Sequence, residues 1–173
     1  MSSKRRSIAL IYGLITGLVL VGYILLLYRF GIGAYMGNAA YLRYLLLFGM
    51  AAAAALAEKK AGGGYLEFRD ALKASFTVIV IALAMETATT YVLMNYIDIP
   101  FRQAVENEEL KRTVAFMRRM KFPESQVNEA ITSSKGVNQH TLPKALQGLA
   151  ISFIAYFIAA LLIAIIVKKK NKP

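Results

Sequence analysis

The stretch ALQGLAISFIAYFIAALLIAIIV, residues 145–167, decides the fold class of this chain. Its 23 positions carry no charge, and an α-helix needs about 20 predominantly apolar residues to cross the hydrocarbon core of a bilayer. The spanning form must be a helix, because an open strand cannot satisfy its backbone hydrogen bonds in lipid. The sequence therefore predicts a membrane-spanning helix that ends just before Lys168, Lys169 and Lys170.

Three more blocks of similar length precede this stretch. They are residues 8–28, which carry no charge, residues 41–57, which carry Arg43, and residues 74–97, which carry Glu86. The whole chain is 57% hydrophobic and 18% charged, whereas a soluble domain is about 45–50% apolar and about 25% charged. We therefore predict an all-α integral membrane protein with four spanning helices in a single membrane domain, residues 1–173.

The first block also has features of a cleaved signal peptide. It follows Lys4, Arg5 and Arg6, and small residues stand downstream at Gly37 and Ala39. Its apolar stretch is longer than the 7–15 residues of a signal sequence, and the candidate cleavage site lies too far from it. We expect this block to remain as a spanning helix.

The distribution of Lys and Arg predicts the orientation. Residues 1–7, 58–73 and 168–173 hold 11 of them in 29 positions, whereas residues 29–43 and 98–144 hold 10 in 62 positions. The denser set belongs on the cytoplasmic side by the positive-inside rule. We therefore expect a multi-pass protein of the bacterial inner (cytoplasmic) membrane with both termini in the cytoplasm, a cytoplasmic hairpin at 58–73 and an outer segment at 98–144.

The formal charge of +11 would indicate nucleic-acid binding in a soluble protein. Here the bases flank the apolar blocks, where they orient the chain and attract anionic headgroups. No basic stripe with interleaved aromatic residues is present in the sequence. We expect the lipid bilayer as a partner and no nucleic acid.

The two connecting segments show helical patterns. Phe68, Leu72 and Phe76 share one helical face and predict a juxtamembrane helix that runs into the third span. Residues 102–121 place acids early and bases late, which complements a helix dipole, and Pro123 then suits the first turn of a second helix that ends before Gly136. Because the outer segment is too poor in apolar residues to bury a large core alone, we expect a helical hairpin lying on the membrane or on a partner.

Glu86 is the most informative single residue. It lies 13 positions after Lys73 and 12 before Asp98, which places it roughly 18–20 Å from either end of its helix, near the bilayer centre. An ionised acid there costs about 2.5–3.5 kcal/mol even on the lower insertion scales. We expect either protonation of the acid or pairing with a base, unless Glu86 lies nearer an interface than this count places it.

Three side chains are candidates to interact with Glu86. Arg43 lies in the outer half of the second span, and its long side chain can reach inward. Thr89 and Thr90 share the helical face of Glu86 and can donate hydrogen bonds. A structural polar lock between helices and a proton- or ion-coupled transport site both remain open as interpretations.

Small residues predict close helix packing. Gly13 and Gly17 form a GxxxG pair in the first span. In the last span a stripe of small residues comprises Gly148, Ser152, Ala155 and Ala159. Such residues let helices approach closely in a membrane, and we favour contacts within one chain over dimerisation.

The residues for most site chemistry are absent from the sequence. There is no cysteine and one histidine, His140, which excludes thiolate metal sites and most zinc and acid–base constellations. His140 lies in a polar linker, residues 137–141, without carboxylate or cysteine neighbours in the sequence, so we expect it to be solvated. Ser133 and Ser134 have no base nearby. We expect no catalytic residues, no metal, no cofactor and no enzymatic activity.

Two stretches carry a family resemblance: GYLEFRDALKASF at residues 64–76 and YIDIPF at residues 96–101. Together with the amphipathic outer segment and the lysine-capped last helix, they resemble the bacterial multi-pass membrane proteins grouped as domain of unknown function family 4199. The resemblance extends over nearly the whole chain. It implies a four-helix inner-membrane protein of unassigned activity and brings no catalytic residues.

Two functional interpretations follow. The first is a non-enzymatic envelope or complex-associated protein whose outer segment, residues 98–144, contacts the membrane surface or a partner, either another envelope protein or a second copy of the chain. The alternative is a small transporter or a proton- or ion-conducting subunit that uses Glu86 with Arg43.

Overall fold

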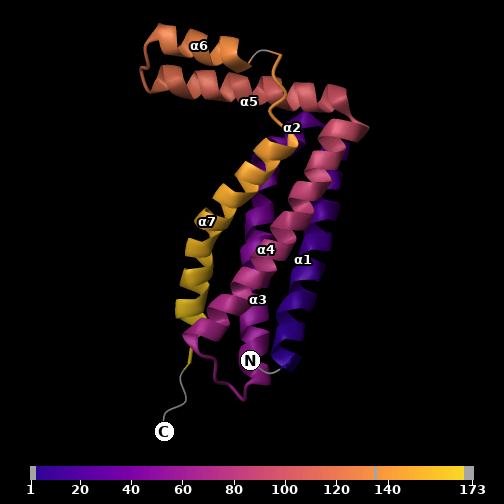
Figure 1. Cartoon of the computed structure of the whole chain (residues 1–173), viewed down its shortest axis with the longest axis vertical. Coiled ribbons are helices and arrows are strands. Elements are labelled where there is room, and N and C mark those ends of the chain that lie inside the picture. The colour runs from indigo at the N-terminus through magenta and orange to yellow at the C-terminus, as the bar shows by residue number, and fades with distance from the viewer. Residues whose placement is uncertain (1–2, 135, 170–173) are drawn as a thin grey trace.

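In a computed structural model of the chain, four long helices form a bundle and a helical hairpin crosses one end of it (Figure 1). The structure describes residues 3–134 and 136–169. The bundle consists of α1 (Ser3–Arg29), α3 (Leu42–Ala61), α4 (Phe68–Val92) and α7 (Leu142–Val167). The hairpin consists of α5 (Ile99–Arg119) and α6 (Glu124–Ser134), and a short helix, α2 (Ile32–Tyr35), follows α1. The predicted all-α fold is confirmed.

Four stretches are long and apolar enough to cross a membrane: Ile8–Arg29, Asn38–Ala61, Phe68–Ile97 and Leu142–Val167. The second begins with a 3-10 turn, Asn38–Tyr41, and the third starts at Phe68, as the repeat of Phe68, Leu72 and Phe76 predicted. The segment expected as a hairpin at 58–73 contributes to both neighbouring helices, so only residues 62–67 connect them. Glu, Lys and Ala are good helix formers, which is why the helices continue beyond the apolar blocks.

The core forms around α4, which contacts α1, α3 and α7. Alanines of α3 and α4, among them Ala51, Ala54 and Ala82, are completely buried there. Gly13 and Gly17 of α1 face Ile81 and Met85 of α4. Small residues therefore bring these helices together within one chain, which is how they commonly pack in membranes.

One end of the bundle is held by contacts between the α3–α4 connection and the end of α7; we call it the bridge end. Leu66 N donates to Lys169 O at 3.0 Å and Lys169 N donates to Leu66 O at 2.9 Å. Lys59 Nζ donates to Val167 O at 2.8 Å. Glu58 belongs to the segment expected as a cytoplasmic hairpin, and it is completely buried here. The side chains of Lys4, Arg5, Arg6 and Lys170, on which the predicted orientation also depends, lie outside the described part.

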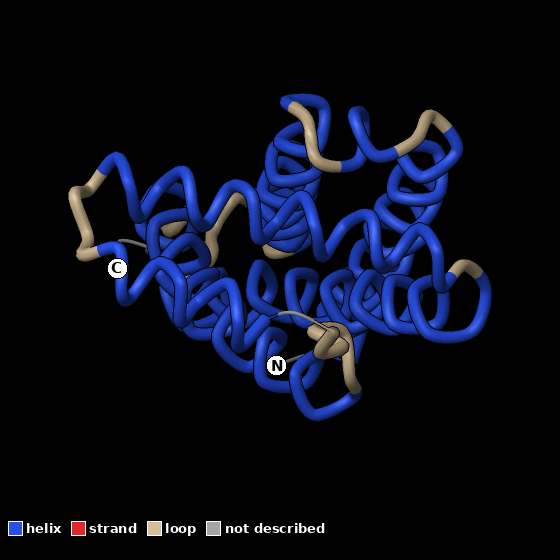
Figure 2. The backbone as a smooth tube through the Cα atoms, turned by 90° about the horizontal axis from the view of Figure 1, so that it is seen from above, coloured by secondary structure: helices blue, strands red, loops and turns tan. Residues whose placement is uncertain are grey.

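At the opposite end, the hairpin end, a π-helical turn (Leu93–Ile97) leads α4 into α5. Asp98 N donates to Leu93 O at 2.9 Å, and the Asp98 side chain accepts from Phe101 N at 2.8 Å, which caps α5. Tyr28 Oη of α1 donates to the same carboxylate at 2.8 Å. These contacts fix α5 across the end of the bundle, and the view from above shows the hairpin loop at the edge of the molecule (Figure 2).

Candidate functional site

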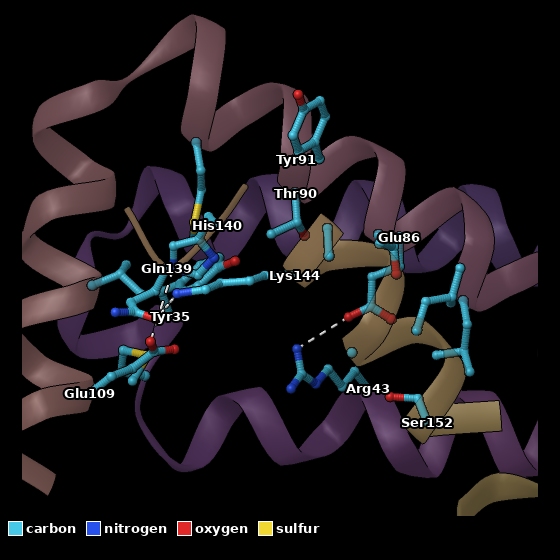
Figure 3. A pocket seen from close by; sticks show the side chains of 18 of the residues that line it. Tyr35, Arg43, Glu86, Thr90, Tyr91, Glu109, Gln139, His140, Lys144 and Ser152 are labelled. Atoms are coloured by element: carbon cyan, nitrogen blue, oxygen red, sulfur yellow. Dashed lines mark hydrogen bonds and ion pairs between the residues drawn. The ribbon is translucent and has the colours of Figure 1, made fainter. Parts of the chain in front are cut away.

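A cavity of about 390 Å³ lies between α3, α4 and α7 at the hairpin end (Figure 3). Side chains of α2, α5 and the 137–141 linker complete its wall. Along α7 it extends from Lys144 to Tyr156, a length of about 18 Å at 1.5 Å per residue. Its volume lies in the range of about 300–1,000 Å³ that is typical of small-molecule sites.

The deep part of the cavity contains an ion pair between two helices. Arg43 Nη1 of α3 donates to Glu86 Oε1 of α4 at 3.1 Å, and Figure 3 shows the two side chains pointing toward each other. Arg43 Nη2 donates to Tyr44 Oη at 2.9 Å, and the guanidinium carbon lies 4.9 Å from the Tyr44 ring centroid. The structure thus places Arg43 beside Glu86, as the sequence predicted, and adds Tyr44.

The two threonines near Glu86 behave differently. Thr89 Oγ1 donates to its own helix, to Met85 O at 2.9 Å, so the expected hydrogen bond from Thr89 to Glu86 is wrong. Threonine hydroxyls often bond the carbonyl four residues back when they lie inside a helix. Thr90 lines the cavity together with Tyr35 of α2.

The mouth of the cavity is polar and lies against α5. His140 Nε2 is 3.9 Å from Glu109 Oε2, and the His140 side chain is only 21% exposed. The expectation that His140 is solvated is therefore wrong. Its carboxylate neighbour, Glu109, is 31 positions away in the sequence, so the local sequence around His140 does not reveal it. Lys144 Nζ donates to Gln139 Oε1, and Gln139 N donates to Glu106 Oε1 at 2.7 Å, which ties the linker to α5.

Burial affects two ionisable groups at the mouth. It raises the pKa of Glu109, while the nearby His140 lowers this pKa and Glu106 raises it. It also raises the pKa of the Tyr35 hydroxyl, which a hydrogen bond to Thr90 and the positive charge of Arg43 partly oppose. The mouth therefore disfavours negative charge on its acid more than bulk water does.

The small-residue stripe of α7 was expected at a helix-packing interface, but it lies largely elsewhere. Gly148 and Ser152 line the cavity, Ala155 is exposed and Ala159 is half-buried. No atom lies within 4 Å of a Cβ placed on Gly148. Within the described chain α7 instead packs through Phe153, Tyr156, Ala160 and Ala164, because these larger and smaller side chains together fill the space beside α4.

Residues 11–169 match a protein family described as "Protein of unknown function (DUF4199)". The chain belongs to this family. The match covers the Arg43–Glu86 pair, the cavity and the α5–α6 hairpin of this DUF4199 protein. The chain matches no curated protein and no solved structure. Since fold and family name assign no activity, function must be argued from the site itself.

Several cavity residues of this DUF4199 protein carry no functional signal in the sequence. Tyrosines near the ends of apolar blocks, such as Tyr35 and Tyr91, are typical of an interfacial belt, yet both line the cavity, as do Tyr44 and Tyr156. Glu109 is one acid of a group typical of a solvated helix. The functional signal of these residues lies only in their position in space, because they come from five separate elements.

Proposed function

We propose that the chain is a non-enzymatic multi-pass protein of the bacterial inner membrane. Its α5–α6 hairpin rests on the outer face of that same membrane, beside the bundle. One observation carries this proposal. The face of α5 that packs on the bundle continues beyond it as an exposed apolar and basic strip. We call this strip the hairpin footprint and define it as Arg112, Phe116, Arg119 and Met120.

The first part of α5 shows which face is turned toward the bundle. The Phe101 ring packs edge-on against Tyr28 and Tyr35, at centroid distances of 4.8 and 5.2 Å. One turn on, Val105 is 1% exposed and lines the cavity, followed by Glu109. At 100° per residue, Arg112 and Phe116 lie within about 20° of Val105, and Arg119 and Met120 within about 60°. The footprint therefore has the same orientation as the residues that touch the bundle.

The opposite face of α5 is already covered. Leu110 and Val114 of α5 and Ile131 of α6 line one apolar groove, and Val127 of α6 is completely buried. In Figure 1 α6 lies on the side of α5 that is turned away from the bundle. Thus α6 covers the apolar face of α5 that is turned away from the bundle, whereas the footprint stays exposed.

The chemistry of the footprint suits an anionic bilayer surface. Phe116 and Met120 are each 59% exposed, and residues 110–123 contain five bases and no acid. The loop of the hairpin projects beyond α7 (Figures 1 and 2), where lipid surrounds a membrane-embedded bundle. Apolar side chains at the headgroup boundary together with Lys and Arg are the features of interfacial helices.

A probe experiment tests this placement. The chain contains no cysteine, so a single Met120→Cys carries one environment-sensitive fluorophore on the footprint. In vesicles that contain phosphatidylglycerol we expect a blue-shifted emission and quenching by lipids labelled near the headgroup. The blue shift should decrease as salt is added, because exposed charges are screened.

The matched control is Asn128→Cys. Asn128 is exposed on α6, the helix that covers the face of α5 opposite the footprint. Its fluorophore should report water in every vesicle. Equal exposure of the two probes to water in anionic vesicles would contradict membrane contact. If the fluorophore at Met120→Cys is shielded from water only in native membranes and not in lipid vesicles, the footprint contacts a protein partner instead.

The second candidate function is transport or proton conduction at Glu86. The observation in its favour is that Glu86 lines a cavity rather than a packed interface. Against a continuous path, Leu47 and Leu83 at the deep end belong to a core cluster that includes the buried Ala51, Ala54 and Val78. Glu86→Gln in proteoliposomes separates the candidates, since coupled transport predicts a folded protein without flux and a structural lock predicts no change in flux.

A further inference from the structure

The cavity walls carry balanced charge from four different elements. Arg43 of α3 and Lys144 of α7 are basic, and Glu86 of α4 and Glu109 of α5 are acidic. Figure 3 shows one pair at the deep end and the other at the mouth. A ligand with a net charge would leave an unbalanced charge in a partly buried site, which costs free energy. The balance therefore favours a ligand without net charge.

The deep end carries a basic group that attracts an anion, the Arg43 guanidinium, whose side chain is 33% exposed. The Arg43 guanidinium uses Nη1 for Glu86 and Nη2 for Tyr44, whereas its Nε is buried and has no hydrogen-bond partner among the described residues. A buried donor without a partner is unfavourable, and the planar guanidinium fork matches a carboxylate or phosphate. Because Arg43 lines the cavity and its side chain is 33% exposed, an anionic oxygen in the cavity can contact the accessible part of the guanidinium.

The rest of the wall suits an ammonium group. Four tyrosine rings line the cavity, from Tyr35, Tyr44, Tyr91 and Tyr156, and aromatic faces attract cations, most strongly where water is excluded. Glu109 adds a carboxylate at the mouth, where its side chain is 46% exposed. A cation held near the mouth therefore meets the Glu109 carboxylate and the nearby Tyr35 ring (Figure 3).

We propose that this cavity binds a small zwitterion, with its phosphate or carboxylate on Arg43 and its ammonium group toward Glu109 and the tyrosines. The site lies in the half of the bundle near the hairpin end. A zwitterion reaches it either as a free solute from the aqueous side or as the headgroup of a lipid. Both sources share the chemistry of one anionic and one ammonium group.

The test uses the full chain in maltoside micelles, which carry no charge. Glycerophosphoethanolamine, whose phosphodiester and ammonium group cancel in net charge, serves as the soluble probe and phosphatidylethanolamine as the lipid probe. A ligand that binds the folded state raises its unfolding temperature, and the rise grows with the logarithm of the ligand concentration above Kd. Far-UV circular dichroism measures this without tryptophan, which the chain lacks. We expect such a concentration-dependent rise with at least one of the two probes.

Two variants address the two ends of the cavity. Arg43→Gln combined with Glu86→Gln removes both deep charges and leaves no lone buried charge, and it should weaken binding by about tenfold to a hundredfold, the value of one or two charge-assisted hydrogen bonds. Glu109→Gln removes the carboxylate proposed to hold the ammonium group. The Glu109 side chain is 46% exposed, so the fold is retained, and the change should weaken binding by several-fold. Lys60→Gln, exposed on α3 at the bridge end, is the matched control and should bind like the parent chain.

The outcomes are distinct. Binding of the soluble probe identifies a free solute as ligand, binding of the lipid alone identifies a headgroup, and both support the proposal. Dimethyl phosphate alone or ethylamine alone should bind at least tenfold more weakly than glycerophosphoethanolamine. Three results would overturn the proposal. They are equal binding of a single-charge probe, unchanged binding in the double variant, and no response to either zwitterion.

Discussion

At the scale of residues, Glu109 shows how the cavity changes the behaviour of one acid. Its pKa is raised above the ordinary value of 4.5, chiefly by burial, with Glu106 acting in the same direction and His140 against it. A raised pKa in the folded state means that folding favours the protonated carboxyl. The stabilising contribution is complete below the unfolded pKa and is lost as the pH rises through the folded pKa.

At a pH above the pKa of Glu109 in the folded protein, Glu109→Gln should therefore increase the free energy of unfolding. Below about pH 4 it should leave this free energy nearly unchanged. Because the Glu109 side chain is 46% exposed, solvent limits the gain to less than about 1 kcal/mol. Denaturant unfolding in detergent from pH 4 to pH 8 measures it. Glu129→Gln on α6 is the control, and an identical pH profile for both variants would contradict the assignment.

The sequence predicts part of the site at this scale. Arg43 and Glu86 are conspicuous because charges inside apolar blocks are costly and need a partner, and the structure pairs them at 3.1 Å. Tyr44, Lys144 and His140 were not predicted as site residues, since each is an ordinary residue for its local segment. Their convergence depends on how α3, α7 and the linker meet, which no local pattern encodes.

At the scale of elements, the contact between α1 and α4 depends on a missing side chain. A Cβ at Gly13 would lie 2.9 Å from Ile81 Cδ1 and 3.1 Å from Ile81 Cβ. Because Ile81 is branched at Cβ and fixed in α4, it cannot move aside easily. Gly13→Ala should therefore reduce the free energy of unfolding by about 1–3 kcal/mol, the usual effect of overpacking.

Gly22→Ala in the same helix is the matched control. No atom lies within 4 Å of a Cβ at Gly22, so this change should be neutral or stabilise by up to about 1 kcal/mol. Unfolding of both variants by SDS titration gives the comparison. Equal destabilisation by the two substitutions would show that helix flexibility, and not the α1–α4 contact, sets the effect.

Helices were predicted well because length and apolar content identify a spanning segment directly. The π-helical turn at Leu93–Ile97 and the short α2 were not predicted, since neither has a characteristic pattern. The stripe of Gly148 and Ala155 was assigned to packing, whereas α7 uses another face. Small residues permit close approach but do not determine which side of a helix is approached.

At the scale of the whole molecule, the orientation of the chain is open to direct measurement. Since the chain has no cysteine, single cysteines at Gly63 and Asn128 report on one connection each. We expect a membrane-impermeant maleimide to label Asn128→Cys in intact spheroplasts and Gly63→Cys only after lysis, because the denser bases belong on the cytoplasmic side. Labelling in the reverse order would invert the topology.

Pairing of Leu66 with Lys169 has a mechanical consequence for the entire assembly. Two backbone hydrogen bonds and the Lys59 contact pin one extremity, whereas the other extremity encloses a void. The α3–α4 connection and the end of α7 are thus tied to each other, so a pull on the end of α7 is passed on to α3 and α4.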